Sequence, residues 1–176
     1  MKTTGVIRRI DELGRIVIPK EIRRNLGIRD GENIEILTDE NSIILKKYSR
    51  IANYLDVVEK IGDLTSSIMN YSVIATDREK VVFVSGIENK DLLGKLVSKD
   101  LISLIDQREI LNNELETKMF FEKIELCGYF AITPIISSND SLGLIIIYNK
   151  NKLSNAEIQF SKLFAKLVAE KIDISW

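Results

Sequence analysis

The chain has 176 residues, of which 45% are hydrophobic and 29% are charged, and its formal net charge is −1. It contains no histidine and one cysteine, which excludes a Ser-His-Asp triad, a histidine-ligated metal site and an internal disulfide. It has neither a secretory signal at its N-terminus nor an apolar run of the roughly 18 residues that span a bilayer, so we expect a cytoplasmic protein.

Positive charge is concentrated at the N-terminus. Residues 1–29 carry eight basic and three acidic residues, a formal charge of +5, whereas residues 51–176 carry 14 basic and 18 acidic residues, a formal charge of −4. Six of the eight bases are arginines, whose planar guanidinium group suits phosphate and base-edge contacts. This distribution predicts a nucleic-acid-binding surface, although charge alone fits a solvated basic face equally well.

The N-terminal residues predict two short strands joined by a tight turn. Alternating apolar and polar residues favour a strand over residues 5–11, and β-branched residues favour another over residues 15–18. Gly14 in the intervening turn can adopt a positive φ.

A short helix and a hairpin complete this N-terminal unit. Pro19 predicts the start of a helix over residues 20–26, and Gly27 stands where a C′ residue would end it. Residues 33–37 and 42–47 then predict two strands of a hairpin around Asp39-Glu40-Asn41.

A unit of under 50 residues buries too little apolar surface to be stable alone, and it has no disulfide or metal to compensate. We therefore predict an obligate dimer, in which a second copy covers the apolar residues. These residues are Val6, Ile7, Ile10, Ile16, Val17, Ile18, Ile34, Ile36, Ile43, Ile44 and Leu45.

Residues 2–48 resemble the AbrB-like transition-state regulator family. The most specific part is the run Leu13-Gly14-Arg15-Ile16-Val17-Ile18-Pro19, followed by the pair Arg23-Arg24. The resemblance implies an all-β swapped-hairpin barrel, formed by two interleaved chains, with a looped-hinge helix.

The same resemblance implies a DNA-binding face. Its arginines are matched here by Arg8, Arg15, Arg23 and Arg24, with a basic family position at Arg9. The competing interpretation is that these arginines only form salt bridges between subunits. Antitoxins share this fold, so an antitoxin-type DNA-binding and protein-interaction module is the alternative function.

Residues 49–70 predict a linker helix with two apolar stripes. One stripe follows heptad spacing and consists of Tyr54, Val57, Ile61, Leu64 and Ile68. The other consists of Ile51, Leu55 and Val58. Two stripes predict two packing partners, although the helix could instead pack only on its own C-terminal domain. Gly62 weakens the helix but permits a close approach.

Residues 71–176 predict one α+β domain with an antiparallel sheet. The expected strands cover residues 71–76, 80–85, 119–126, 129–136 and 142–148. The expected helices cover residues 91–97, 99–105 with Ser98 as N-cap, and a final helix after Ser154 whose apolar residues form one broad face.

This layout is similar to a GAF domain, a small-molecule sensor fold. The residues that carry the similarity are Pro134-Ile135-Ile136 and the run Leu142-Gly143-Leu144-Ile145-Ile146-Ile147. A ligand of unknown identity would bind between the sheet and residues 86–110. Candidate lining residues are Phe83, Ser85, Asp106, Arg108 and Tyr129.

Together, the two resemblances imply a sequence-preferring transcriptional regulator of sporulation genes that acts as activator and repressor. The expected domains are an AbrB-like DNA-binding domain at residues 1–48, the linker helix at 49–70 and a GAF-like domain at 71–176. The expected partner is double-stranded DNA, and the expected assembly is a homodimer through the N-terminal domain and a homotetramer overall. We expect no enzymatic activity, metal or cofactor, because the sequence contains no paired acidic motif and no metal motif.

Overall fold

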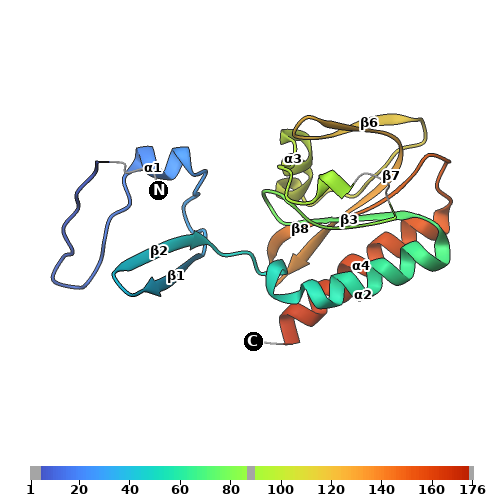
Figure 1. The fold of residues 1–176 in the computed structure, drawn as a ribbon. Helices are drawn as coiled ribbons and strands as arrows, with labels where there is room; N and C mark the ends of the chain where they lie inside the picture. The colour runs from blue at the N-terminus through green and yellow to red at the C-terminus, as the bar shows by residue number, and fades with distance from the viewer. Residues whose placement is uncertain (1–4, 87–89, 175–176) are drawn as a thin grey trace. The chain divides into compact units, whose positions relative to one another are not determined.

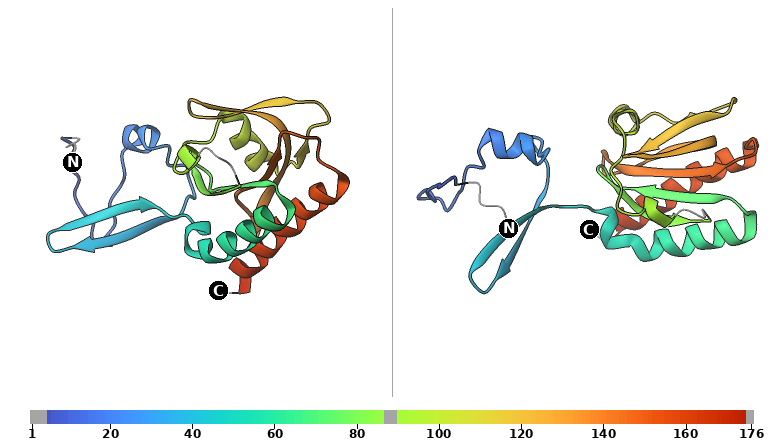
Figure 2. Two further views of the ribbon diagram at one scale, coloured as in Figure 1. Left: turned by 45° about the vertical axis from the view of Figure 1, so that its right-hand side comes forward. Right: turned by 45° about the horizontal axis from the view of Figure 1, so that its top comes forward.

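The computed structural model describes residues 5–86 and 90–174. Residues 2–4 of the family resemblance and residues 87–89 of the expected ligand site therefore lie outside the described residues. The chain divides into two units, residues 1–48 and residues 49–176 (Figures 1 and 2).

The N-terminal unit contains one short helix and one hairpin. Helix α1 spans Lys20–Asn25, strand β1 spans Ile34–Asp39, and strand β2 spans Ser42–Lys47. The two strands pair antiparallel, with Ile34 opposite Lys47 and Asp39 opposite Ser42. The predicted hairpin is confirmed, with its first strand longer than expected.

The ends of α1 follow the predicted signals. Pro19 precedes the helix, and its carbonyl accepts a hydrogen bond from the Arg23 amide at 3.0 Å. Gly27 has a φ of 62°, and its amide donates to the Arg24 carbonyl, while the Ile28 amide donates to the Arg23 carbonyl at 2.8 Å. This pair of bonds is a Schellman motif, which requires a residue such as glycine in the left-handed region.

The predicted strands over residues 5–11 and 15–18 were wrong for the single chain. The loop between them forms, because the Asp11 amide donates to the Arg15 carbonyl at 3.1 Å and Gly14 has a φ of 75°. Beyond this loop, however, neither segment pairs with any strand of the described chain. A strand requires a ladder of hydrogen bonds to a neighbouring strand, and neither segment belongs to a sheet of the described residues.

The C-terminal unit is built on one antiparallel sheet with strand order β4-β3-β8-β7-β5, and β6 pairs with β7. The strands are β3 (Ser72–Thr76), β4 (Val81–Ser85), β5 (Leu111–Asn112), β6 (Thr117–Phe121), β7 (Ile124–Ser137) and β8 (Asp140–Asn149). The helices are η1 (Ile51–Tyr54), α2 (Leu55–Met69), η2 (Lys90–Leu92), α3 (Lys99–Gln107) and α4 (Asn155–Ile174).

Two layers cover the sheet, one on each face. Helices α2 and α4 lie side by side on one face, where Val58 and Phe164 belong to one apolar core (Figures 1 and 2). Helix α3 lies on the other face, where Leu101 and Ile105 pack in a second core with side chains of β6. The predicted α+β architecture is confirmed.

Two predicted elements of this unit were wrong. Residues 91–97 form only the end of η2, after which Val97 makes an isolated bridge with Phe121. The strand predicted over residues 119–126 is a hairpin, because Glu122 adopts a φ of 54° and reverses the chain between β6 and β7. The two adjacent polar residues in this apolar run, Glu122 and Lys123, form the turn.

The two stripes of the linker helix have different environments. Ile51 and Val58 of the second stripe are fully buried within the C-terminal unit. Leu64 and Ile68 of the heptad stripe are 60% and 77% exposed. Tyr54 and Ile61 of the heptad stripe are half-buried against the same core, so only the C-terminal end of that stripe is uncovered in the single chain.

The final helix also presents two faces rather than one broad face. Phe164 and Val168 of α4 are buried, whereas Leu163 and Leu167 are exposed. Apolar residues on both long helices thus remain uncovered.

Gly62 allows α2 to lie directly on the sheet. A Cβ atom at this position would lie 2.2 Å from Cε1 of the Phe83 ring. The close approach expected at Gly62 occurs, but its partner is an aromatic side chain of β4 rather than a crossing helix.

We predict that Gly62→Ala destabilises the C-terminal unit by about 1–2 kcal/mol, because overpacking against Phe83 outweighs the gain in helix propensity. Thermal unfolding measured by circular dichroism would test this. Ser67→Ala, at an exposed position of the same helix, should change little. Adding Phe83→Leu to Gly62→Ala should restore part of the lost stability, because the smaller side chain leaves room for the new methyl group. A Gly62→Ala variant that is more stable than wild type would contradict this prediction.

A buried carboxylate holds the start of α4. Glu157 Oε2 accepts a hydrogen bond from the Ser154 amide at 2.6 Å, and Oε1 accepts one from the Tyr71 hydroxyl at 2.9 Å. The Ser154 hydroxyl accepts from the Ala156 amide, so the predicted cap is confirmed as a capping box. Burial alone would raise the pKa of Glu157, but the hydrogen bonds from Ser154 and Tyr71 outweigh it, and the pKa lies below its usual 4.5.

A lowered pKa means that the Glu157 carboxylate stabilises the fold above about pH 4.5 and loses this effect as the pH falls through its folded-state pKa. We therefore predict that Glu157→Gln lowers the free energy of unfolding at pH 7 by about 1–3 kcal/mol, and that the difference from wild type narrows in acid. Denaturant unfolding across pH 3–7 measures this. If the difference in the free energy of unfolding between wild type and Glu157→Gln stays constant from pH 7 to pH 3, the prediction is wrong.

Candidate nucleic-acid interface

The five predicted DNA-contacting arginines lie on three segments of the N-terminal unit. Arg8 and Arg9 precede the loop at residues 11–15, Arg15 ends that loop, and Arg23 and Arg24 lie on α1. All are exposed except Arg23, which is half-buried.

Asp11 organises the loop and Arg15 together. One carboxylate oxygen, Oδ1, accepts hydrogen bonds from the Leu13 amide at 3.0 Å and the Arg15 amide at 2.8 Å. The other, Oδ2, accepts from Arg15 Nε at 2.7 Å. These bonds, led by the one from the Arg15 amide, hold the pKa of Asp11 below its usual 3.8.

The two arginines of α1 are in different environments. Arg23 forms an ion pair with Asp30 in the turn after the helix. Arg24 is exposed and makes no ion pair with any residue in 5–86 or 90–174. Acidic neighbours therefore engage Arg15 and Arg23, while Arg8, Arg9 and Arg24 stay open to solvent.

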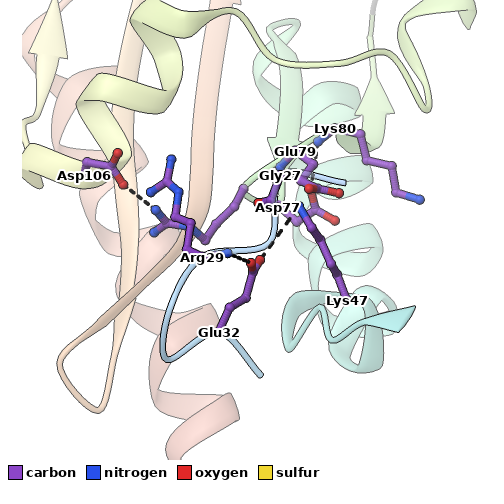
Figure 3. A network of polar contacts seen from close by, with 9 residues as sticks. Gly27, Arg29, Glu32, Lys47, Asp77, Glu79, Lys80 and Asp106 are labelled. Atoms are coloured by element: carbon purple, nitrogen blue, oxygen red, sulfur yellow. Dashed lines mark hydrogen bonds and ion pairs between the residues drawn. The ribbon is translucent and has the colours of Figure 1, made fainter. Parts of the chain in front are cut away.

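A polar network joins the end of α1 to the hairpin. Lys47 Nζ donates to the Gly27 carbonyl at 3.0 Å and lies 3.9 Å from Glu32 Oε1, while Glu32 Oε2 accepts from the Arg29 amide at 2.8 Å (Figure 3). Sequence reasoning missed Glu32 and Lys47, because partners 15 to 20 residues apart leave no local signal.

The N-terminal unit leaves its apolar residues uncovered. Not one residue from 5 to 48 is buried, and Ile7 is 91% exposed. The other large apolar residues that stay exposed here are Val6, Ile10, Leu13, Ile16, Val17, Leu26, Ile36, Ile43 and Leu45. Isolated exposed apolar residues are ordinary, but this concentration is typical of a surface that another chain covers.

The residues proposed to line a ligand site in the C-terminal unit do not gather in one place. Phe83 packs on Gly62, and the Ser85 hydroxyl donates to Asp63 at 2.7 Å, so both face α2. Tyr129 packs against a small apolar cluster of Ala131, Ile147 and Leu153.

The remaining two candidates lie near the end of α3. Asp106 forms an ion pair with Arg78, and the Arg108 guanidinium donates to Asn139 in the β7–β8 turn. The expectation that these five residues share one pocket is therefore corrected. Sequence order could not tell which face of the sheet each side chain occupies.

No cluster of three or more metal-ligating residues occurs in the part of the chain that the structure describes. The helices within this part are too short or too polar to cross a membrane. The thiol of Cys127 is exposed, and a hydrogen bond to Glu116 raises its pKa.

Comparison with known proteins decides the family. Residues 55–173 match the family model described as "Stage V sporulation protein T C-terminal, transcription factor". Stage V sporulation protein T of Bacillus subtilis (strain 168) is 39% identical over 155 residues, which cover 86% of this chain and 87% of that protein. The chain belongs to the stage V sporulation protein T family.

The N-terminal unit has its own relatives. "Transition state regulatory protein AbrB" of B. subtilis is 58% identical over 48 residues, or 27% of this chain and 50% of that protein. The solved N-domain of the transcription factor abrB shares 58% identity, with a TM-score of 0.26 and coverage of 27% of this chain and 92% of that chain. Residues 7–53 also match the model "Antidote-toxin recognition MazE, bacterial antitoxin". The predicted AbrB-like resemblance is confirmed.

The C-terminal unit shares its fold with a solved structure. A structure of the cyanobacteriochrome receptor PixJ covers 71% of this chain and 98% of that chain, with 13% identity and a TM-score of 0.54. At this identity the likeness shows a shared fold alone. The family model of the C-terminal unit is described as a transcription factor, and the AbrB relatives are described as a transition state regulatory protein and a transcription factor.

Proposed function

We propose that this member of the stage V sporulation protein T family regulates sporulation genes, as activator and repressor, by binding double-stranded DNA through a dimeric N-terminal domain. The main support for this function is that the N-terminal unit combines exposed arginines with uncovered apolar residues. The same unit is 58% identical to a DNA-recognition domain of AbrB.

The dimer supplies what the single chain lacks. Residues 5–11 and 15–18 have strand-like sequences but belong to no described sheet, and most of the apolar side chains in them are exposed. A second copy would pair with these strands and bury the apolar side chains, in the swapped-hairpin barrel that the family resemblance implies.

The dimer would also double the cationic surface. Arg8, Arg9, Arg15, Arg23 and Arg24 would become ten guanidinium groups. If six to eight of them neutralise phosphates, the logarithm of affinity should fall with the logarithm of salt concentration with a slope of about −5 to −7. Such contacts with the backbone favour a loose sequence preference based on DNA shape.

The C-terminal domain is proposed to hold dimers together and to sense a small molecule. Leu64 and Ile68 on α2, with Leu163 and Leu167 on α4, are exposed apolar residues on adjacent helices. A second copy against these helices would give a homotetramer. The sensing role rests on the family resemblance, since the five residues predicted to line a ligand site do not lie together.

The antitoxin alternative finds support in the match of residues 7–53 to an antitoxin model. An antitoxin typically continues into a disordered toxin-binding tail. Residues 49–176 instead form a folded unit with its own apolar cores, and most of them match the sporulation family. The regulator is therefore the better-supported function.

We predict that Arg23→Ala or Arg24→Ala weakens DNA binding by roughly ten-fold and makes the salt slope about two smaller in magnitude, because each change removes two contacts from a dimer. Fluorescence anisotropy on A·T-rich DNA at several salt concentrations measures both quantities, and circular dichroism checks the fold. Lys60→Ala, which removes an exposed charge from α2, is the control and should bind as wild type does. Unchanged binding in both arginine variants would exclude this face.

We also predict that Ile36→Asp disrupts the dimer and abolishes DNA binding, because it places a charge on an apolar surface that the second chain covers. Native mass spectrometry of the full chain would record the assembly and separate dimers from tetramers. The neighbouring Glu35→Ala changes an exposed polar residue and should keep the wild-type assembly. A monomeric wild-type protein would contradict the dimer.

A further inference from the structure

We propose that Asp11 is a positioning residue for DNA binding: it holds the Arg15 guanidinium by one edge, so that the opposite edge is presented to the duplex. This inference rests on the proposed DNA-binding function. It concerns an acidic residue, which by charge alone should only repel DNA.

Asp11 is itself held in place before it holds Arg15. Its Oδ1 accepts two backbone hydrogen bonds, from Leu13 and Arg15, within a loop that Gly14 closes. Its Oδ2 therefore has a fixed direction, and it meets Arg15 Nε at 2.7 Å. The carboxylate links the shape of the loop to the orientation of one side chain.

The contact uses only one nitrogen of Arg15. A guanidinium group has five N–H donors in a rigid plane, and Nε–H is one of them. The side chain is 71% exposed, and Nε makes its bond to Asp11. The terminal nitrogens, which suit a bidentate contact with phosphate or guanine, make no ion pair with a described residue.

The pair between Arg23 and Asp30 shows a different arrangement. The side chain of Asp30 is 91% exposed, and no backbone hydrogen bond to its carboxylate is seen in the described chain. Asp30 is therefore not held as Asp11 is. Of these two acidic residues, only Asp11 has one carboxylate oxygen fixed by the backbone while the other binds an arginine, so the positioning role is assigned to Asp11.

Two effects of Asp11 on DNA affinity have opposite signs. Its negative charge repels phosphate, so removing the charge should strengthen binding. Its bond to Nε restricts a side chain with several rotamers, so removing that bond should weaken binding by making DNA order the side chain instead. A useful experiment must separate these effects.

The neighbouring residue supplies a matched control. Glu12 is exposed and carries the same charge, but it has no hydrogen bond or ion pair with any other described residue. Glu12→Gln therefore removes a charge from the same loop without altering a contact of Arg15. Asp11→Asn keeps an oxygen that can accept the two backbone bonds, while its amide group cannot accept from Nε.

The test compares both variants in the full chain by anisotropy on labelled A·T-rich DNA. Asp11→Asn should weaken binding about three- to ten-fold, within the range expected for an exposed pair present twice in a dimer, whereas Glu12→Gln should bind as tightly as wild type or more tightly. Affinity of Asp11→Asn equal to that of Glu12→Gln would overturn the positioning role. Failure of the wild-type protein to bind would instead contradict the proposed function.

A double-mutant cycle separates positioning from folding. In an Arg15→Ala background, Asp11→Asn should cause no further loss of affinity, because there is no guanidinium left to hold. A full additional loss there would show that Asp11 acts through the loop alone and would overturn the inference. Arg15→Lys provides a second variant that leaves the backbone bonds of Asp11 intact. Arg15→Lys should bind DNA more weakly, because the single ammonium nitrogen of lysine cannot bind Asp11 through one edge and DNA through another. Wild-type affinity of Arg15→Lys would contradict the inference.

Discussion

The N-terminal unit depends on apolar contacts that its own chain does not provide. Its helix, hairpin and loop are each correctly formed, yet no side chain between residues 5 and 48 is buried. Local hydrogen bonds shape these pieces, but burial of apolar surface is the main source of folding free energy, and it is missing here. The proposed DNA binding therefore depends on a second chain that completes the unit.

The C-terminal unit buries its apolar residues within one chain. Its sheet has an apolar core on each face, one under α2 and α4 and one under α3. Three arginines from distant parts of the unit donate hydrogen bonds to residues in and next to the β7–β8 turn. Arg50 donates to Ser137 at 3.0 Å, Arg78 to the Ser141 carbonyl at 2.8 Å, and Arg108 to the Asn139 carbonyl at 2.5 Å. Because Arg50 follows β2 so closely, the folded C-terminal unit begins almost where the N-terminal hairpin ends.

Predictions from sequence succeeded where the signal is local. Gly27 at the end of α1, Ser98 and Ser154 as caps, and the hairpin of β1 and β2 depend on residues within a few positions of one another. Predictions failed where the answer depends on a distant partner. The strand expected at residues 5–11 lacks a neighbour in one chain, and Phe83 was assigned to a ligand site although it packs on Gly62 of α2.

The amino-acid sequence by itself determined the family resemblance, the basic N-terminus and the identity of the five arginines, because these are properties of residue order and type. Only the tertiary structure decided how each arginine is held. It placed Asp11 against Arg15 and Asp30 against Arg23, and it turned Leu64 and Ile68 outward while Ile51 and Val58 became buried. Side-chain direction and burial depend on how the backbone folds in three dimensions, and helix periodicity alone cannot tell which residues of two apolar stripes are covered.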